Sequence, residues 1–261
     1  MTTTPDGGGR RAVVVTGGGS GIGLGITARF VSDGFHVVVL DHANEEKAAR
    51  LAALAVPNGV AAPQLIDADV RERDRLLEVG RTLQSAGTEV GTVITSAGVN
   101  QRMLALDVPD EAVHRILEVN LYGTWATFLA FAPAVLQGPG GRFVAITSVN
   151  AIHGMRLRAP YGASKSGILG LVKALAVEWA PSGATVNAVG PGVIETPLTG
   201  SYMASNPDKR AAAIEHTPVG RIGRPEDVAG VVAFLNSHDA DFVTGQTIWV
   251  DGGLSAGSSW W

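Results

Sequence analysis

The stretch Ala12-Val-Val-Val-Thr16-Gly-Gly-Gly-Ser-Gly21-Ile-Gly23 decides the fold that the sequence predicts. Its first five residues are apolar or β-branched, which indicates a buried strand, and its glycines lead into a helical pattern that continues through Phe30 and Val31. Glycines between a strand and a helix let the backbone approach a phosphate closely, and the helix N-terminus then favours the anion. A glycine-rich turn without a ligand is the simpler alternative.

Alternating strands and helices continue this pattern along the chain. The predicted strands span residues 12–16, 35–40, 64–68, 91–95, 142–147, 184–189 and 246–250. The predicted helices cover about 44–54, 71–85, 109–136, 159–180 and 225–236, and residues 194–216 are expected to be irregular. This alternation predicts an α/β fold, a single-domain Rossmann-type doubly wound parallel sheet with helices on both faces.

Composition narrows the class of protein. The 261 residues are 46% apolar and 17% charged, which suffices for a large core, and no linker-like segment or repeat divides them. We therefore expect a flexible tail over residues 1–10 and one Rossmann-fold domain over residues 11–261. The net charge of −4, with no cluster of lysine and arginine, argues against a nucleic-acid partner.

Several kinds of site and location are not expected. The chain has no cysteine, which excludes disulfides, thiolate metal sites and a cysteine nucleophile. No histidine pair has metal-ligand spacing, so we expect no metal. The first residues lack the apolar segment of a signal peptide, and no apolar run reaches transmembrane length. A cytoplasmic location is therefore expected.

Polar residues and glycines follow the predicted strands, at the edge of the sheet where ligands of such folds bind. Asp41 ends the second strand, 18 residues after Gly23, where its carboxylate can accept hydrogen bonds from both adenosine ribose hydroxyls and would repel a 2′-phosphate. No arginine lies in the glycine turn, and Arg10 and Arg11 precede the opposite end of the first strand, so NAD is favoured over NADP. Asp69 has two open roles, contact with adenine or capping of a helix.

The stretch Tyr161-Gly-Ala-Ser-Lys165 supplies a candidate acid/base. Residues four apart lie on the same face of a helix, and an ammonium favours the phenolate, so Lys165 is expected to lower the pKa of Tyr161. An ordinary helix with one buried aromatic and one surface lysine is the alternative. Ser148, at a strand end 13 residues before Tyr161, can hold a substrate oxygen, and Asn120 is a polar residue within a predicted helix.

From about Ala12 to Gly253, these motifs together resemble the short-chain dehydrogenase/reductase family in its form of about 250 residues. The matching motifs are Thr16-Gly-x-x-x-Gly-Ile-Gly23, Asp69-Val70, Ala97-Gly98, Asn120, Ser148, Tyr161-x-x-x-Lys165, Pro191-Gly192, Gly223-Arg-Pro-Glu-Asp-Val-Ala229, Thr244-Gly-Gln and Val250-Asp-Gly-Gly253. The chain departs from the family at Ser96, where an asparagine is usual. Its glycine turn differs from the general dinucleotide spacing G-x-G-x-x-G, whose last glycine is missing in every register.

The resemblance implies residue roles. Tyr161 would exchange the proton, Lys165 would lower its pKa and bind the nicotinamide ribose, Ser148 would orient the substrate oxygen, and Asn120 would position a water. The cofactor-binding residues would be Gly17, Ser20, Gly21, Ile22, Gly23, Asp41, Asp69, Val70, Ala97, Gly98, Tyr161, Lys165, Pro191, Gly192, Ile194 and Thr196.

The implied function is NAD-dependent hydride transfer between a secondary alcohol and a ketone, by a homotetramer built through the two long helices and the last strand. A sugar, polyol or sugar acid is the expected substrate, and Arg102 gives a hint of the sugar-acid and polyol members. A 3-oxoacyl-thioester reductase and a non-catalytic NAD-binding regulator are the alternatives. Substrate choice is assigned to residues 99–104, 149–160 and 194–216, of which the last is a possible lid. The terminal Trp260-Trp261 could dock on a neighbouring subunit or cover a pocket.

Overall fold

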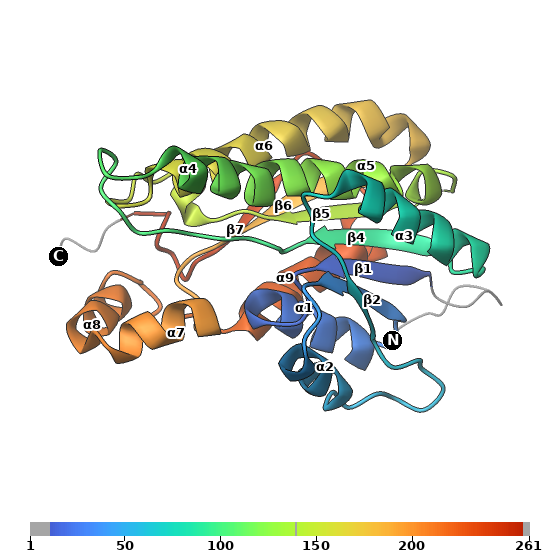
Figure 1. The fold of residues 1–261 in the computed structure, drawn as a ribbon, viewed down its shortest axis with the longest axis horizontal. Coiled ribbons are helices and arrows are strands. Elements are labelled where there is room, and N and C mark those ends of the chain that lie inside the picture. The colour runs from blue at the N-terminus through green and yellow to red at the C-terminus, as the bar shows by residue number, and fades with distance from the viewer. Residues whose placement is uncertain (1–10, 139, 258–261) are drawn as a thin grey trace.

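A seven-stranded parallel sheet forms the centre of the protein, in a computed structural model that describes residues 11–138 and 140–257 (Figure 1). The strand order is β3-β2-β1-β4-β5-β6-β7. The strands are β1 (Ala12–Thr16), β2 (Val37–Asp41), β3 (Gln64–Asp67), β4 (Val90–Thr95), β5 (Arg142–Ile146), β6 (Thr185–Pro191) and β7 (Thr247–Val250). The order reverses between β1 and β4, which is where such sheets open a crevice for ligands. The predicted α/β fold is confirmed.

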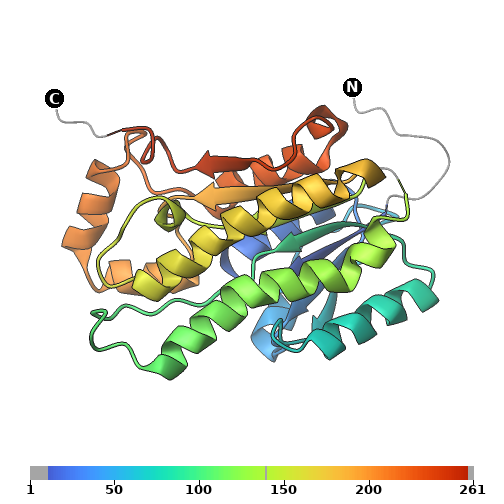
Figure 2. The same cartoon turned by 90° about the horizontal axis from the view of Figure 1, so that it is seen from above.

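Helices cover both faces of the sheet and enclose two apolar clusters (Figures 1 and 2). One face carries α3 (Arg73–Ser85), α4 (Asp110–Leu117), α5 (Gly123–Val135) and α6 (Ala159–Trp179). The other carries α1 (Gly21–Ser32), α2 (Glu45–Ala52) and α9 (Pro225–Asn236). Because both faces are covered, strands such as β1 and β5 are buried throughout and carry uninterrupted apolar runs.

The helix predicted over residues 109–136 is interrupted. A π-helical turn at Glu118–Tyr122 separates α4 from α5, and Asn120 lies at its centre with its side chain fully buried. A π turn inserts a residue without a proline or glycine to mark it, so the apolar pattern did not reveal it. The side chain of Asn120 reaches Val99, after β4, and Ser164 on α6.

The prediction that residues 194–216 are irregular is wrong. The segment contains α7 (Pro197–Ala204) and α8 (Pro207–Glu215), which lie together beyond one end of the sheet (Figure 1). Each helix begins at a proline, which is favoured in the first turn because its fixed φ suits the helix and no backbone N–H is needed there. The prolines that suggested a loop are therefore helix starts.

Two expectations fall on residues that the structure does not describe, namely the tail at residues 1–10 and the terminal Trp260-Trp261. In residues 11–138 and 140–257, no helix is both long enough and apolar enough to cross a membrane.

Candidate functional site

The glycine turn between β1 and α1 has no room for a side chain at Gly17 or Gly23. Gly17 and Gly21 have φ values of +67° and +53°, in the left-handed region that favours glycine. A Cβ atom at Gly23 would lie 2.1 Å from the carbonyl oxygen of Gly17, and one at Gly17 would lie 2.7 Å from the backbone of Ala97. Ser20 is the N-cap of α1 but makes no side-chain capping hydrogen bond. Ile22 follows in the first turn of α1. Because no side chain caps this helix, its N-terminal N–H groups are suited to bind a phosphate.

Asp41 ends β2 beside this turn, as predicted, but it has a cationic partner. One carboxylate oxygen accepts a hydrogen bond from Gly19 N at 3.0 Å, and the other lies 2.6 Å from Lys47 Nζ. Lys47 stands in the first turn of α2. Asn44 caps this helix, because its Oδ1 accepts a hydrogen bond from the backbone N–H of Lys47. This lysine, six residues after Asp41 and outside the glycine turn, was not among the predicted site residues.

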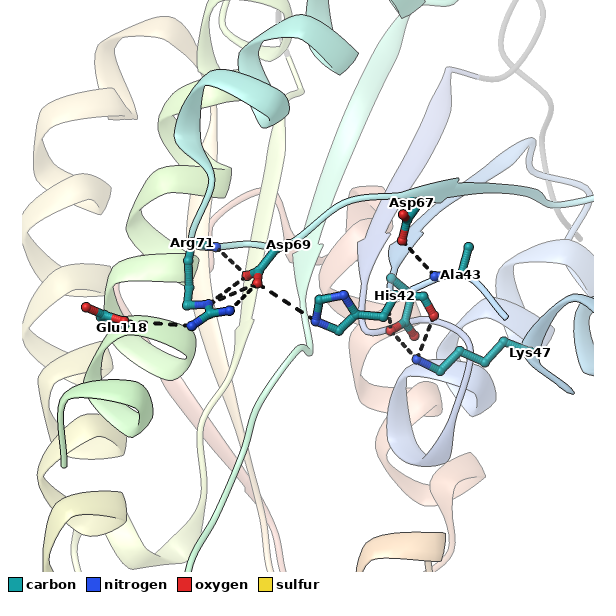
Figure 3. A network of polar contacts seen from close by, with 8 residues as sticks. His42, Ala43, Lys47, Asp67, Asp69, Arg71 and Glu118 are labelled. Atoms are coloured by element: carbon teal, nitrogen blue, oxygen red, sulfur yellow. Dashed lines mark hydrogen bonds and ion pairs between the residues drawn. The ribbon is translucent and has the colours of Figure 1, made fainter. Parts of the chain in front are cut away.

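Asp69 lies in the loop after β3 and pairs with Arg71 at 2.6 Å, while Glu118 lies 4.0 Å from the other side of that guanidinium (Figure 3). The hydrogen bond from Arg71 lowers the pKa of Asp69 below its ordinary value. The alternative of Asp69 as a helix cap is wrong, because Glu72 is the N-cap of α3. Val70 is buried, and a Cβ atom at Gly123 would lie 2.6 Å from it, so Val70 packs against the start of α5.

Asn120 fastens the segment that follows β4. Its Oδ1 accepts from Val99 N at 2.8 Å, and its Nδ2 donates to Val99 O at 3.0 Å and to Ser164 Oγ at 3.0 Å. This clamp ties the residues after Ala97-Gly98 to α6. A Cβ atom at the exposed Gly98 would lie 3.4 Å from Asn120 Oδ1 and 3.7 Å from the ammonium of Lys165. Gly98 therefore leaves open backbone between the glycine turn and the catalytic candidates.

Lys165 is almost fully buried on the inner face of α6. Its Nζ donates to the carbonyl of Ile146 at 2.8 Å and lies 5.8 Å from the centre of the Tyr161 ring. Burial lowers the pKa of Lys165 to about 8, because the charged form loses its hydration. Its side chain can therefore change its protonation near neutral pH.

Tyr161 does not have the lowered pKa that the sequence predicted. Burial raises the pKa of Tyr161, while a hydrogen bond with Ser148 and the charge of Arg158 oppose that effect. The ammonium of Lys165 is directed to a backbone carbonyl instead of to the phenol, so its influence on the tyrosine is small in this arrangement. The predicted direction failed because the environment of the phenol depends on tertiary packing.

The segment after β6 closes the opposite side of the site. Pro191 is the last residue of β6, and Gly192 donates its N–H to the final residue of β7. Ile194 is buried and forms an isolated parallel bridge with Gly223. A Cβ atom at Gly21 would lie 3.4 Å from Thr196, so Thr196 stands beside the glycine turn.

The set fits a dinucleotide. Residues at the ends of β1, β2, β4, β5 and β6 reach the same edge of the sheet. The glycine turn, the Asp41 carboxylate at the end of β2 and the exposed Gly98 lie at this edge, between α1 and α6. Of the two carboxylates predicted to bind the cofactor, Asp69 is the one that already forms an ion pair with an arginine, Arg71. Within the described ranges, no group of three or more His, Asp or Glu side chains is arranged to hold a metal ion.

Comparison with known proteins identifies relatives of the chain. The family described as Enoyl-(Acyl carrier protein) reductase matches residues 17–255. The 3-oxoacyl-(acyl-carrier-protein) reductase FabG of Thermotoga maritima is 33% identical over 236 residues, covering 90% of this chain and 94% of the relative.

Two solved structures also superpose closely. The short-chain dehydrogenase/reductase described as a glucose/ribitol dehydrogenase from Brucella melitensis has a TM-score of 0.86 and 32% identity, covering 94% of this chain and 96% of that one. A candidate NAD(P)-dependent gluconate 5-dehydrogenase from Beutenbergia cavernae, with bound NADP, has a TM-score of 0.87 and 34% identity, covering 95% and 98%. With the strand order and the extent of the family match, these similarities show that the chain belongs to the short-chain dehydrogenase/reductase family.

Proposed function

We propose that this protein is an NAD-dependent oxidoreductase that interconverts a secondary alcohol and a ketone, acting on a sugar, polyol or sugar acid in the cytoplasm. One observation carries the proposal. Tyr161 has Ser148 as a polar neighbour that opposes the rise of its pKa, and it stands one helical turn from the buried Lys165, at the sheet edge that also holds the glycine turn. A non-catalytic NAD-binding regulator would not need this group.

In the proposed mechanism, Tyr161 is the general acid/base. In oxidation its phenolate oxygen accepts the proton of the substrate hydroxyl, and in reduction its hydroxyl donates that proton to the carbonyl oxygen. Ser148 donates a hydrogen bond to the same substrate oxygen and so fixes its position. The bound nicotinamide supplies the acceptor or donor of the hydride.

Lys165 and Asn120 support this acid/base. With a pKa of about 8, Lys165 can exist in both protonation states near neutral pH, which suits a group that passes protons between Tyr161 and solvent. Asn120 holds Val99 and the adjacent Gly98 in place, so its proposed contribution includes fixing the wall of the nicotinamide site.

The proposed preference for NAD rests on Asp41. Its carboxylate would accept from the ribose hydroxyls and repel a 2′-phosphate, whereas Lys47 neutralises part of that charge. Calorimetric titration should find NAD bound more tightly than NADP. Asp41→Ala should weaken the binding of NAD and reduce the preference for NAD over NADP. Lys47→Met should increase that preference, because it removes the cation that pairs with Asp41. Equal affinity of the wild-type protein for both cofactors would refute this assignment.

Reduction of a 3-oxoacyl thioester is the second candidate, because the Thermotoga maritima relative carries that name at 33% identity. A panel of polyols, aldoses, sugar acids and acetoacetyl thioesters, followed by NADH absorbance, separates the two candidates. Turnover confined to the thioesters would replace the proposed substrate class. Without turnover of any compound, a non-catalytic role becomes the better account.

A homotetramer is proposed from an apolar groove on the outside of α4, α5 and α6. Its apolar lining is Leu117, Leu121, Trp125 and Leu171, and Trp125 keeps 38% of its surface exposed. Tyr122 and the charged side chains of Asp69, Arg71, Glu72 and Glu118 complete the lining. An exposed apolar groove of this kind is typical of an interface. We assign it to a second copy of this chain, because α5 and α6, which border the groove, run side by side along the same side of the sheet (Figure 2).

A further inference from the structure

Two arginine side chains lie against tyrosine rings at the catalytic end of α6. The guanidinium carbon of Arg158 is 5.7 Å from the centre of the Tyr161 ring, and that of Arg102 is 3.5 Å from the centre of the Tyr202 ring. Across residues 11–138 and 140–257, neither guanidinium forms an ion pair with a carboxylate. The pair therefore has positive charge without a counter-charge from the described protein.

The electrostatics of this pair are unfavourable without an anion. Burial lowers the pKa of Arg158, and the nearby positive charge of Arg102 lowers it further. Like charges that lie close in a partly dehydrated environment repel each other, and an anion between them would reverse that effect. An exposed arginine such as Arg156, two residues earlier, lacks this environment.

The backbone brings the two arginines together from distant parts of the chain. Met103 N donates to Leu157 O at 3.1 Å, which joins the segment after β4 to the segment before α6. Leu157 has a φ of 70°, and among the described residues it is the only one other than glycine with a positive φ. Such strain persists where the surrounding structure enforces it, and it occurs most often at functional sites. Here it sets the direction in which the chain enters Arg158 and α6.

We propose that Arg102 and Arg158 bind an anionic group of the substrate, a carboxylate or phosphate ester on a hydroxylated carbon chain, while Tyr161 acts on a hydroxyl of the same molecule. The proposal rests on the oxidoreductase function proposed above and narrows its substrate class. Arginine suits this role because its planar group donates paired hydrogen bonds to carboxylate and phosphate oxygens. Tyr202, from α7, holds Arg102 against its ring and contributes a wall of the subsite.

Arg158 could instead act only by lowering the pKa of Tyr161. That role would affect anionic and neutral substrates equally, because both would depend on the same phenol. An anion subsite predicts a selective effect. The ratio of kcat/KM for a charged substrate to kcat/KM for its neutral analogue therefore distinguishes the two roles.

The test compares gluconate and sorbitol 6-phosphate with neutral sorbitol, with NAD as oxidant, in wild type, Arg102→Gln, Arg158→Gln and Arg158→Lys. Arg156→Gln is the control, because that side chain is exposed in the same loop. Wild type should favour an anionic compound over sorbitol. Losing a charged hydrogen-bonding pair should lower the ratio of kcat/KM for the anionic compound to kcat/KM for sorbitol by about 10- to 100-fold in each glutamine variant. The control should leave that ratio unchanged, and a change in the pKa of Tyr161 in Arg158→Gln affects both compounds and cancels in the ratio. Arg158→Lys should keep part of the preference.

The outcomes separate failure of this proposal from failure of the proposed function. If sorbitol is turned over as well as both anions, and the glutamine variants leave the ratio unchanged, the subsite is refuted and the oxidoreductase function stands. If no compound is turned over, calorimetric titration of gluconate and sorbitol 6-phosphate into the protein with NADH decides. The subsite is supported if the wild type binds an anion and Arg102→Gln and Arg158→Gln each abolish that binding. It is refuted if the wild type binds neither anion. Circular dichroism melting verifies that each variant is folded.

Discussion

Replacing Lys165 by methionine should change how the stability of the protein depends on pH. The lysine is only 5% exposed, and burial lowers its pKa from 10.5 to about 8. The folded protein therefore releases this proton at lower pH than the unfolded chain. Methionine has a similar shape and does not titrate, so the variant isolates the contribution of the ammonium.

The magnitude follows from the two pKa values. Their difference corresponds to about 3 kcal/mol, at about 1.4 kcal/mol for each pH unit. Below pH 8 the folded state bears the full penalty of the buried charge, and between about 8 and 10.5 the unfolded chain binds more protons than the folded protein. The unfolding free energy of the wild type should therefore rise relative to Lys165→Met across this window.

Urea unfolding at several pH values from 7 to about 10.5 measures this difference. Other titrating groups are common to both proteins, so their effects on the unfolding free energy largely cancel. The variant also leaves the Ile146 carbonyl without its donor, but this cost is the same at every pH and does not contribute to the change. The wild type should gain about 3 kcal/mol relative to Lys165→Met between the two ends of the range. A difference that stays constant within about 0.5 kcal/mol would refute the buried-ammonium argument.

Three further predictions concern the turn, the acid/base and the interface. Gly23→Ala should abolish NAD binding in calorimetry and lower the melting temperature, because its Cβ would lie 2.1 Å from the Gly17 carbonyl oxygen; unchanged binding would contradict the closed turn. Ser148→Ala should lower kcat and move the pH profile of oxidation upward, because it removes a hydrogen bond that lowers the pKa of Tyr161; an unmoved profile would count against that bond. Trp125→Arg should convert a tetramer to smaller species in sedimentation, whereas an unchanged mass would place the interface elsewhere.

The sequence predicted the fold well because burial on both sides gives parallel strands continuous apolar runs, as in Val13 to Val15 of β1. It failed where the local signal has two meanings. Pro197 and Pro207 were read as breaks but begin helices, and nothing in the residues around Asn120 marks the π turn. These features depend on how the segments pack.

The site was predicted less completely than the fold. The four-residue spacing correctly placed Tyr161 and Lys165 on one helix, α6, but the pKa of Tyr161 is raised because desolvation exceeds the effect of its polar neighbours. Lys47 was missed because its contact with Asp41 depends on where α2 begins. Spacing identifies which residues share an element, whereas burial and charge pairing require the folded structure.

Tyr161→Phe tests the central claim most directly, because it removes one hydroxyl and keeps the ring. The measurement is steady-state turnover, by NADH absorbance, of the compound in the panel that the wild type converts fastest, with NAD affinity measured by calorimetry on the same preparation. The proposed mechanism predicts that kcat falls by about 10²- to 10⁴-fold while NAD binding changes little. Turnover by Tyr161→Phe within a few-fold of the wild type would contradict the assignment of Tyr161 as the acid/base.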